Sequence, residues 1–207
     1  MSRYVVTGTD TGIGKTVFAA ALAGALGAHY WKPVQAGDDD GTDSELVARL
    51  SGLPASHILP EVYCLATPCS PHRAAEIDGV TIEPARLALP EVDGPLVVEG
   101  AGGVMVPLTR NILYADVFRA WNCPVVLVAR TALGTINHSL LSLEALHTRG
   151  VPVLGVAFVG DSNPDSEEII VGLGGMRRLG RLPVLDPLDH MSLTQAFRDN
   201  FNLADFT

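Results

Sequence analysis

The sequence predicts an α/β fold, in which a doubly wound and mostly parallel sheet carries helices on both faces. Short apolar runs at Tyr4–Val6, Leu96–Val98, Val125–Ala129 and Val153–Val159 are nearly continuous. Continuous rather than alternating apolar character is typical of strands that are buried on both faces. Segments with helical periodicity separate these runs, and strands that alternate with helices indicate a parallel sheet.

The segments between and after the apolar runs show the spacing of apolar residues that predicts helices. They are Lys15–Leu26, Ser44–Leu50, Ala115–Trp121, Ile136–Arg149, Ser166–Leu173 and Leu193–Phe201.

A short apolar segment, Tyr30–Pro33, predicts a further strand that ends beside the first strand. The stretch from Ser51 to Pro95 is rich in proline, which predicts loops, short helices and an edge strand. Ligands of doubly wound folds bind at the carboxyl ends of the strands. Residues that follow the strands are therefore the first candidates for function.

The composition limits the classes of function that the chain can have. At 207 residues without a linker-like stretch, residues 1–207 are expected to form one domain. The formal net charge of −9 repels phosphate backbones and anionic lipid, which argues against nucleic acid and membranes as partners. No apolar stretch approaches the roughly 20 residues of a membrane span, and MSRYVVTGTD does not have the pattern of a signal peptide. Cys64, Cys69 and Cys123 lack the spacing of a zinc site, so we expect reduced thiols in a cytoplasmic protein.

The glycine-rich stretch GTDTGIGKT, residues 8–16, lies between the first strand and the first helix. A phosphate-binding loop needs inward backbone N–H groups, a lysine for the outer phosphates and a hydroxyl for Mg²⁺. Gly14, Lys15 and Thr16 supply the last glycine, the lysine and the hydroxyl, which predicts a P-loop NTPase-like fold. The usual pattern has a glycine where Thr9 stands, so the match fails at that position. The alternative is an ordinary glycine-rich turn, which the position between a strand and a helix disfavours.

Two carboxylates and a second lysine lie near other element ends. Glu99 follows Leu96–Val98 at the predicted carboxyl end of a buried strand, where a charge is costly without a cation; the alternative is an exposed residue in a tight turn. Lys32, at the end of the second strand, can neutralise charge on a transferring phosphoryl group; the alternative is a surface lysine. Asp43 follows the acidic stretch Asp38–Asp40 and begins a predicted helix. For Asp43, a helix N-cap or a solvated acidic loop is, on local sequence alone, as good an interpretation as a metal ligand.

Six short motifs occur in order along the chain. They are GTDTGIGKT (8–16), WKPVQAG (31–37), TDS (42–44), SPH (70–72), VEGAGG (98–103) and LGTINH (133–138). With this ordered set the chain resembles the dethiobiotin synthetases, enzymes of biotin formation. The resemblance extends from residue 4 to about residue 160, and a weaker LGRLP follows at 179–183. The glycine loop alone would not be specific for this family, whereas the ordered set is.

The resemblance implies a reaction. Members of the family convert 7,8-diaminopelargonate, CO₂ or bicarbonate and ATP into dethiobiotin, ADP and phosphate, with Mg²⁺. One amine takes up CO₂ as a carbamate, ATP phosphorylates the carbamate, and the second amine attacks the mixed anhydride to close a cyclic urea. Family members are homodimers with shared active sites, so the resemblance also implies a second copy of the chain as a partner.

The resemblance also implies roles for particular residues. Lys15 and Lys32 flank the transferring phosphoryl group, and Thr11 helps to position the carbamate. Mg²⁺ is held by Thr16, Asp43 and Glu99. The nucleotide is bound by Thr9, Asp10, Thr11, Gly12, Ile13, Gly14, Lys15, Thr16, Val17, Gly160, Asp161 and Pro183. The substrate is bound by Lys32, Ala36, Gly102, Gly103, Val104, Leu133, Gly134 and Asn137, of which the segment Leu133–Asn137 comes from the partner chain.

Three positions depart from the family pattern. Gly12 stands where some relatives have Glu, so any acidic role at this position is lost. Ala36 stands where many relatives have Ser or Thr, and a missing buried donor costs roughly 0.5–1.5 kcal/mol. Gly160 stands where relatives that use ATP often have an Asn that reads the adenine edge. We therefore hypothesise a relaxed or altered nucleotide preference.

Other classes of function fit the sequence less well. A related ATP-dependent amide ligase usually continues into a glutaminase domain, for which 207 residues leave no room. A nucleotide-driven switch of the partition and septum-placement type has a lysine five residues before the loop lysine, where this chain has Asp10. A scaffold role would leave no common reason for Lys32, Glu99 and the glycine loop to converge at strand ends.

Overall fold

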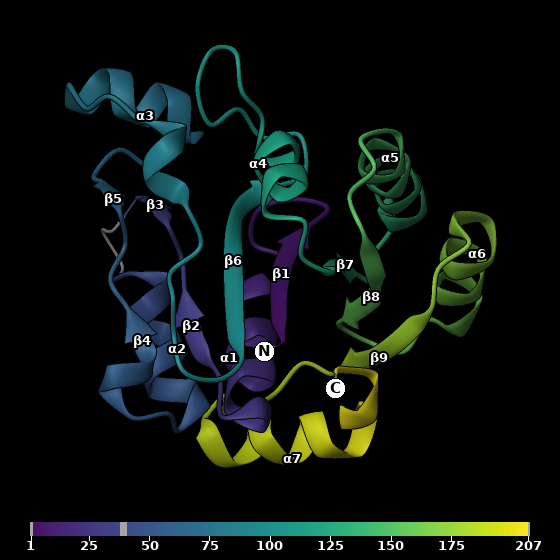
Figure 1. The fold of residues 1–207 in the computed structure, drawn as a ribbon. Coiled ribbons are helices and arrows are strands. Elements are labelled where there is room, and N and C mark those ends of the chain that lie inside the picture. The colour runs from purple at the N-terminus through teal and green to yellow at the C-terminus, as the bar shows by residue number, and fades with distance from the viewer. Residues whose placement is uncertain (1, 38–40, 207) are drawn as a thin grey trace.

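A computed structural model describes residues 2–37 and 41–206, and these residues form the doubly wound α/β fold that the sequence predicts (Figure 1). Within them, seven parallel strands make the main sheet in the order β4-β2-β6-β1-β7-β8-β9. The strands are β1 (Arg3–Gly8), β2 (His29–Trp31), β4 (Ile58–Leu59), β6 (Leu96–Gly103), β7 (Val125–Arg130), β8 (Val153–Val159) and β9 (Arg178–Leu182).

Helices cover both faces of this sheet. Helices α1, α2 and α7 pack together on one face, whereas α4, α5 and α6 lie on the opposite face (Figure 1). Among the helices of the described residues, none has both the length and the apolar character needed to cross a bilayer. The bounds are α1 (Lys15–Leu26), α2 (Asp43–Ser51), α3 (Pro71–Asp78), α4 (Tyr114–Trp121), α5 (Thr135–Thr148), α6 (Pro164–Gly174) and α7 (His190–Asn200).

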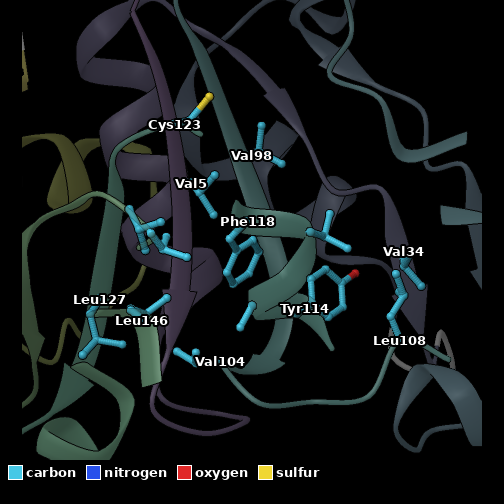
Figure 2. Close-up of a cluster of buried hydrophobic side chains, with 14 of the residues drawn as sticks. Val5, Val34, Val98, Val104, Leu108, Tyr114, Phe118, Cys123, Leu127 and Leu146 are labelled. Carbon is cyan, nitrogen blue, oxygen red and sulfur yellow. The ribbon is translucent and has the colours of Figure 1, made fainter. Parts of the chain in front are cut away.

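Alternate residues of the strands enter two separate cores. In β1, Tyr4 and Val6 face the core on the α1 side, while Val5 faces the core on the α4 side. Figure 2 shows this second core, where the side chains of Tyr114 and Phe118 from α4 gather with Val5. Because both faces of the sheet are covered, the central strands have no polar face, and this explains their continuous apolar runs.

Helix α1 is apolar around most of its circumference because the sheet, α2 and α7 enclose it. Phe18 and Leu22 are fully buried in this core. Gly24 allows α1 and α2 to approach closely, since a Cβ at this position would lie 2.5 Å from the carbonyl oxygen of Ser51. The helix ends at Gly27, whose φ of 58° is the left-handed conformation that favours glycine. This packing holds the N-terminus of α1, and with it the glycine loop, against the sheet.

The proline-rich stretch from Ser51 to Pro95 contains the predicted loops, short helices and edge strand, which is β4. A two-stranded sheet of β3 (Val34–Ala36) and β5 (Tyr63–Leu65) also forms, although the apolar pattern does not predict it. Strands of three residues are too short to show a period. Three-residue and four-residue 3₁₀ helices lie at Ala55–His57, Pro84–Leu87 and Leu203–Phe206.

Two predictions about the strands near the glycine loop need correction. Strand β2 does not lie beside the first strand, because β6 is inserted between β1 and β2. Strand β6 does not end at Val98 but continues to Gly103, so Glu99 lies within the strand rather than after it. The glycines that follow Glu99 are therefore strand residues, and their pairing with β1 is irregular between Val6 and Gly8.

Strand β9 does not appear in the sequence pattern, because its residues RLGRL include a glycine and two arginines. Arg178 contacts the buried carboxylate of Glu167 on α6 at 2.7 Å, and Arg181 lies 3.9 Å from the same carboxylate. Ion pairs with α6 thus take the place of an apolar run at this edge of the sheet. The acidic stretch Asp38–Asp40, noted in the sequence, lies outside the described residues.

We expect Leu22→Ala to lower the free energy of unfolding by about 2–5 kcal/mol, because it leaves a cavity in the core that holds α1. Leu173→Ala on α6 is the matched control, since Leu173 is 71% exposed; its effect should stay within about 0.5 kcal/mol. Urea denaturation followed by circular dichroism measures both. Equal losses in the two variants would contradict the assigned packing of α1.

Candidate active site

The carboxyl ends of β1, β2 and β6 meet around a cavity of about 770 Å³. The glycine loop forms one wall and the end of β6 another, and the segment after β2 reaches the same space. The lining includes the predicted residues Thr11, Gly12, Ile13, Gly14, Lys15, Thr16, Val17, Lys32, Ala36, Asp43, Glu99 and Gly102. Residues far apart in the chain thus share one cavity.

The glycine loop has a backbone that only glycine adopts readily. Gly12 and Gly14 have φ values of 68° and 92°, both in the left-handed region. At Gly14, the N-cap of α1, a Cβ would also lie 2.7 Å from Cγ1 of Val159, so the loop packs closely against the end of β8. Lys15 Nζ donates a hydrogen bond to the carbonyl oxygen of Asp10 at 2.7 Å, which folds the lysine back over its own loop.

Four polar side chains converge beside this loop. Thr16 Oγ1 lies 2.8 Å from Asp43 Oδ1 and 2.9 Å from Glu99 Oε1. Lys32 Nζ forms an ion pair with Asp43 and lies 3.3 Å from Glu99 Oε1. Glu99 is 0% exposed and Lys32 is 5% exposed, so the exposed alternatives considered for both residues are wrong. The charge of a fully buried carboxylate is balanced here by a buried ammonium group.

The two lysines of this cavity, Lys15 and Lys32, are the only lysines in the sequence. Burial lowers the pKa of Lys15; the Glu99 carboxylate opposes that change, and the Lys32 charge adds to it. For Lys32 burial also disfavours the charge, but the carboxylates of Glu99 and Asp43 outweigh burial and raise the pKa. Asp43 shows the reverse: burial favours the neutral acid, yet the Lys32 ammonium outweighs it and lowers the pKa. Lys32 and Asp43 thus each favour the charged form of the other.

Asp43 is the first residue of α2, but it is not the N-cap. Thr42 is the cap: its hydroxyl accepts from the Glu45 amide at 3.2 Å, and Glu45 Oε2 accepts from the Thr42 amide at 2.9 Å. This capping box leaves the Asp43 carboxylate unused by the helix. The Asp43 carboxylate contacts Thr16 and Lys32 instead, so the N-cap interpretation of Asp43 is wrong.

The donor set at this point fits Mg²⁺. Thr16 Oγ1 and one oxygen from each of Asp43 and Glu99 lie within hydrogen-bond distance of one another. Mg²⁺ prefers oxygen ligands and is commonly bound through one or two carboxylates together with nucleotide phosphates and water. The Lys32 ammonium group contacts both carboxylates and balances part of their negative charge, which a bound metal cation would also do.

Some predicted residues lie outside the main cavity. Thr9, Asp10, Gly103 and Val104 line a neighbouring hollow of about 440 Å³, which Thr11 joins to the first cavity. The predicted substrate residues at the start of α5 do not reach either space in the single chain. They are Leu133, which is fully exposed, Gly134, which is the N-cap of α5, and Asn137, which is exposed.

The predicted base-binding residues Gly160, Asp161 and Pro183 follow β8 and β9 at the same edge of the sheet. Gly160 has a φ of 126°, and a Cβ there would lie 2.5 Å from Thr131 Oγ1. Its carbonyl oxygen accepts from Arg181 Nη1 at 2.7 Å, and its amide donates to the carbonyl oxygen of Leu182 at 3.0 Å. Glycine at this position is thus required by the backbone, and an asparagine would not fit without a shift.

Sequence reasoning gave no role to several residues of the cavity or the cluster, among them Tyr30, Gln35 and Ser70. Tyr30 donates to Glu99 Oε2 at 2.8 Å, Gln35 Oε1 lies 3.4 Å from the Asp43 amide, and Ser70 lines the cavity. Tyr30 could have been found, because a buried tyrosine hydroxyl needs a partner and Tyr30 stands two residues before Lys32 along the chain.

Comparisons with known proteins place the chain in a family. A family model described as "AAA domain" matches residues 2–192. Proteins named ATP-dependent dethiobiotin synthetase BioD are similar over their whole length. The one from Novosphingobium aromaticivorans is 67% identical over 100% of both chains, and that from Rhodopseudomonas palustris strain HaA2 is 67% identical over 98% of this chain and 95% of the relative. The chain belongs to the dethiobiotin synthetase family. As a dethiobiotin synthetase it is a ligase of biotin biosynthesis that uses ATP.

Solved structures support the fold of this dethiobiotin synthetase. The cell division ATPase MinD of Pyrococcus furiosus is 13% identical, with a TM-score of 0.50 over 95% of this chain and 89% of that chain. Chloroplast FtsY of Physcomitrella patens is 14% identical, with a TM-score of 0.50 over 94% of this chain and 64% of that chain. At this identity the likeness concerns the fold alone, which is P-loop NTPase-like.

We expect Gly14→Ala to weaken nucleotide binding far more than Gly12→Ala. Both residues have a positive φ, so either substitution strains the backbone by about 1–2 kcal/mol. Only Gly14 also faces a clash, with Val159, whereas a Cβ at Gly12 meets nothing within 4 Å. Isothermal titration calorimetry with Mg-ATP should show a loss of at most about 30-fold for Gly12→Ala, as that strain allows, and a larger loss for Gly14→Ala. Equal losses would contradict the packing of the loop against β8.

Proposed function

We propose that this chain closes the cyclic urea of dethiobiotin on 7,8-diaminopelargonate, using CO₂ and ATP with Mg²⁺. The observation that carries the proposal is the buried cluster of Lys32, Asp43 and Glu99 beside Lys15 and Thr16. It joins a phosphate-binding loop to a second lysine in one cavity that is large enough for two ligands. Residues 1–207 would act as a single domain.

The reaction would proceed in three steps. The nitrogen of one amine attacks the carbon of CO₂ and loses a proton, giving a carbamate. An oxygen of the carbamate attacks the γ-phosphorus of ATP, and ADP leaves. The nitrogen of the second amine then attacks the carbamoyl carbon, so that the C–N bond of the ring forms, phosphate leaves and a proton is lost.

The residues of the cavity have separate roles in these steps. Lys15, in the glycine loop, would hold the outer phosphates, and Lys32, across the cavity, would face the carbamate and the transferring phosphoryl group. The Thr11 hydroxyl would position the carbamate between them. Positioning and charge stabilisation are the main contributions of a protein to phosphoryl transfer. Burial strengthens these electrostatic interactions, because the surroundings are less polar than water.

Thr16, Asp43 and Glu99 would hold Mg²⁺, which when bound neutralises charge on the nucleotide phosphates. The carboxylates already lie together, so binding requires little reorganisation of the chain. Lys32 would then exchange part of its contact with Asp43 and Glu99 for contact with the substrate.

We propose that a second copy of the chain completes the substrate site. Leu133 is fully exposed beside the Gly134 N-cap of α5, and Asn137 is exposed one turn later. An exposed leucine beside the N-terminus of a helix suits the apolar chain and terminal carboxylate of 7,8-diaminopelargonate. Within one chain these residues do not line the cavity, so the partner's copy would supply them.

We expect the wild-type protein, given Mg-ATP, bicarbonate and 7,8-diaminopelargonate, to form a cyclic urea that mass spectrometry detects. Lys15→Ala should lower kcat by roughly 100-fold or more, as the loss of a transition-state donor does. Arg119→Ala, an exposed basic residue in the last turn of α4, is the control and should keep the wild-type rate. A near-wild-type rate for Lys15→Ala would remove this lysine from the reaction.

We propose that the nucleotide preference of this chain is relaxed, since Gly160 has no side chain to read the base. We expect kcat/KM values for ATP, CTP and GTP that differ by less than about tenfold, a difference of roughly 1.4 kcal/mol. Steady-state rates at equal nucleotide concentrations test this. A strong preference for ATP would contradict the proposal and would assign base recognition to backbone groups or to other side chains.

A further inference from the structure

Glu99 uses its two carboxylate oxygens for different partners. Oε1 lies 2.9 Å from Thr16 Oγ1 and 3.3 Å from Lys32 Nζ, so it faces the cavity. Oε2 accepts a hydrogen bond from the hydroxyl of Tyr30 at 2.8 Å and faces the protein interior. The tyrosine thus determines which oxygen of Glu99 is presented to the cavity.

The position of Tyr30 is set by strand pairing and core packing. Tyr30 pairs with Val97 across the parallel strands β2 and β6, two residues before Glu99. Tyr30 is 0% exposed and belongs to the core on the α1 side of the sheet. A ring enclosed in this way has one orientation, because the rotamers of core side chains are limited by close packing.

The Tyr30 hydroxyl donates its hydrogen bond directly to the Glu99 carboxylate. A protonated phenol next to a carboxylate makes a charge-assisted hydrogen bond, which is stronger than one between neutral groups.

We propose that Tyr30 is a positioning residue that orients Glu99 for the divalent cation of the Thr16–Asp43–Glu99 cluster. The inference rests on the proposed function only in taking this cluster as the Mg²⁺ site. Hydrogen-bond partners behind a metal ligand fix its orientation, and their loss typically lowers metal affinity by about 10- to 100-fold. Tyr30 does not line the cavity, so it acts through Glu99 and not on the substrate.

The test is a Mg²⁺ titration at a fixed, saturating concentration of a non-hydrolysable ATP analogue, measured by isothermal titration calorimetry. We expect Tyr30→Phe to raise the apparent dissociation constant for Mg²⁺ by about tenfold. The analogue is not turned over, so the readout does not depend on the chemical reaction. An unchanged constant in a folded Tyr30→Phe protein would overturn the inference.

Tyr4→Phe is the matched control. Tyr4 is also buried in the core on the α1 side, and its hydroxyl donates to the carbonyl oxygen of Phe206 at 2.5 Å, far from the cluster. This variant loses one buried hydrogen bond of the same donor, so it should lose stability without a change in the Mg²⁺ constant. The same rise in both variants would make the effect of Tyr30→Phe one of general stability and would overturn the inference.

A double-mutant cycle shows whether Tyr30 acts through Glu99. Glu99→Gln replaces the carboxylate that Tyr30 is inferred to orient with a neutral amide. This variant should itself raise the dissociation constant for Mg²⁺. In this background Tyr30→Phe should change the constant by less than about twofold, because coupled residues are not additive. A full tenfold further rise in the double variant would overturn the inference.

Substituted phenylalanines keep the test valid if Tyr30→Phe does not fold. 4-Fluorophenylalanine at position 30 fills the space of the hydroxyl without an N–H or O–H donor, whereas 4-aminophenylalanine keeps a donor. We expect a higher Mg²⁺ dissociation constant with 4-fluorophenylalanine and a near-wild-type dissociation constant with 4-aminophenylalanine. Equal dissociation constants would overturn the inference. If no nucleotide supports dethiobiotin formation but the Tyr30-dependent Mg²⁺ effect persists, the proposed reaction fails and the role of Tyr30 stands.

Discussion

The site depends on one buried interaction, the contact of the Lys32 ammonium group with the carboxylates of Asp43 and Glu99. Glu99 is fully buried in the middle of the sheet, where an unpaired charge would be strongly unfavourable. Lys32 removes that cost and draws Asp43, at the start of α2, onto the end of β6. The interaction joins three separate elements into one wall of the cavity.

Close backbone packing places the glycine loop against this wall. Gly14 lies against Val159 of β8, and Gly8 leaves room for Ile13 and Lys15, whose side-chain carbons lie 2.6 Å and 2.9 Å from where its Cβ would be. Helix α1, enclosed by the sheet and two helices, holds the loop from behind. The glycine loop is therefore packed against the sheet on the same cavity as the carboxylate cluster.

The edge of the sheet at the ends of β8 and β9 is organised differently. Arg181 donates to the carbonyl oxygen of Gly160, and Glu167 lies 3.9 Å from the same guanidinium group. Gly160 thus contributes only backbone groups to these contacts.

The sequence by itself determined the α/β class, the main strands and the helix α1, because both faces of the sheet are buried and the apolar runs are continuous. The sequence also predicted the glycine loop with Lys15 and Thr16, because the residues of this motif are contiguous in the chain. The short β3–β5 sheet and β9 could not be predicted, because three-residue strands have no period and Arg178 is balanced by a partner on α6.

Only the tertiary structure decided the surroundings of Asp43, Glu99 and Tyr30. Local sequence left a helix cap open for Asp43, and the capping box at Thr42 excludes it. Glu99 proved to be buried within β6, because β6 lies between β1 and β2 in the sheet. Strand order brings Tyr30, Lys32 and Glu99 together, and strand order is a property of long-range pairing that no local pattern encodes.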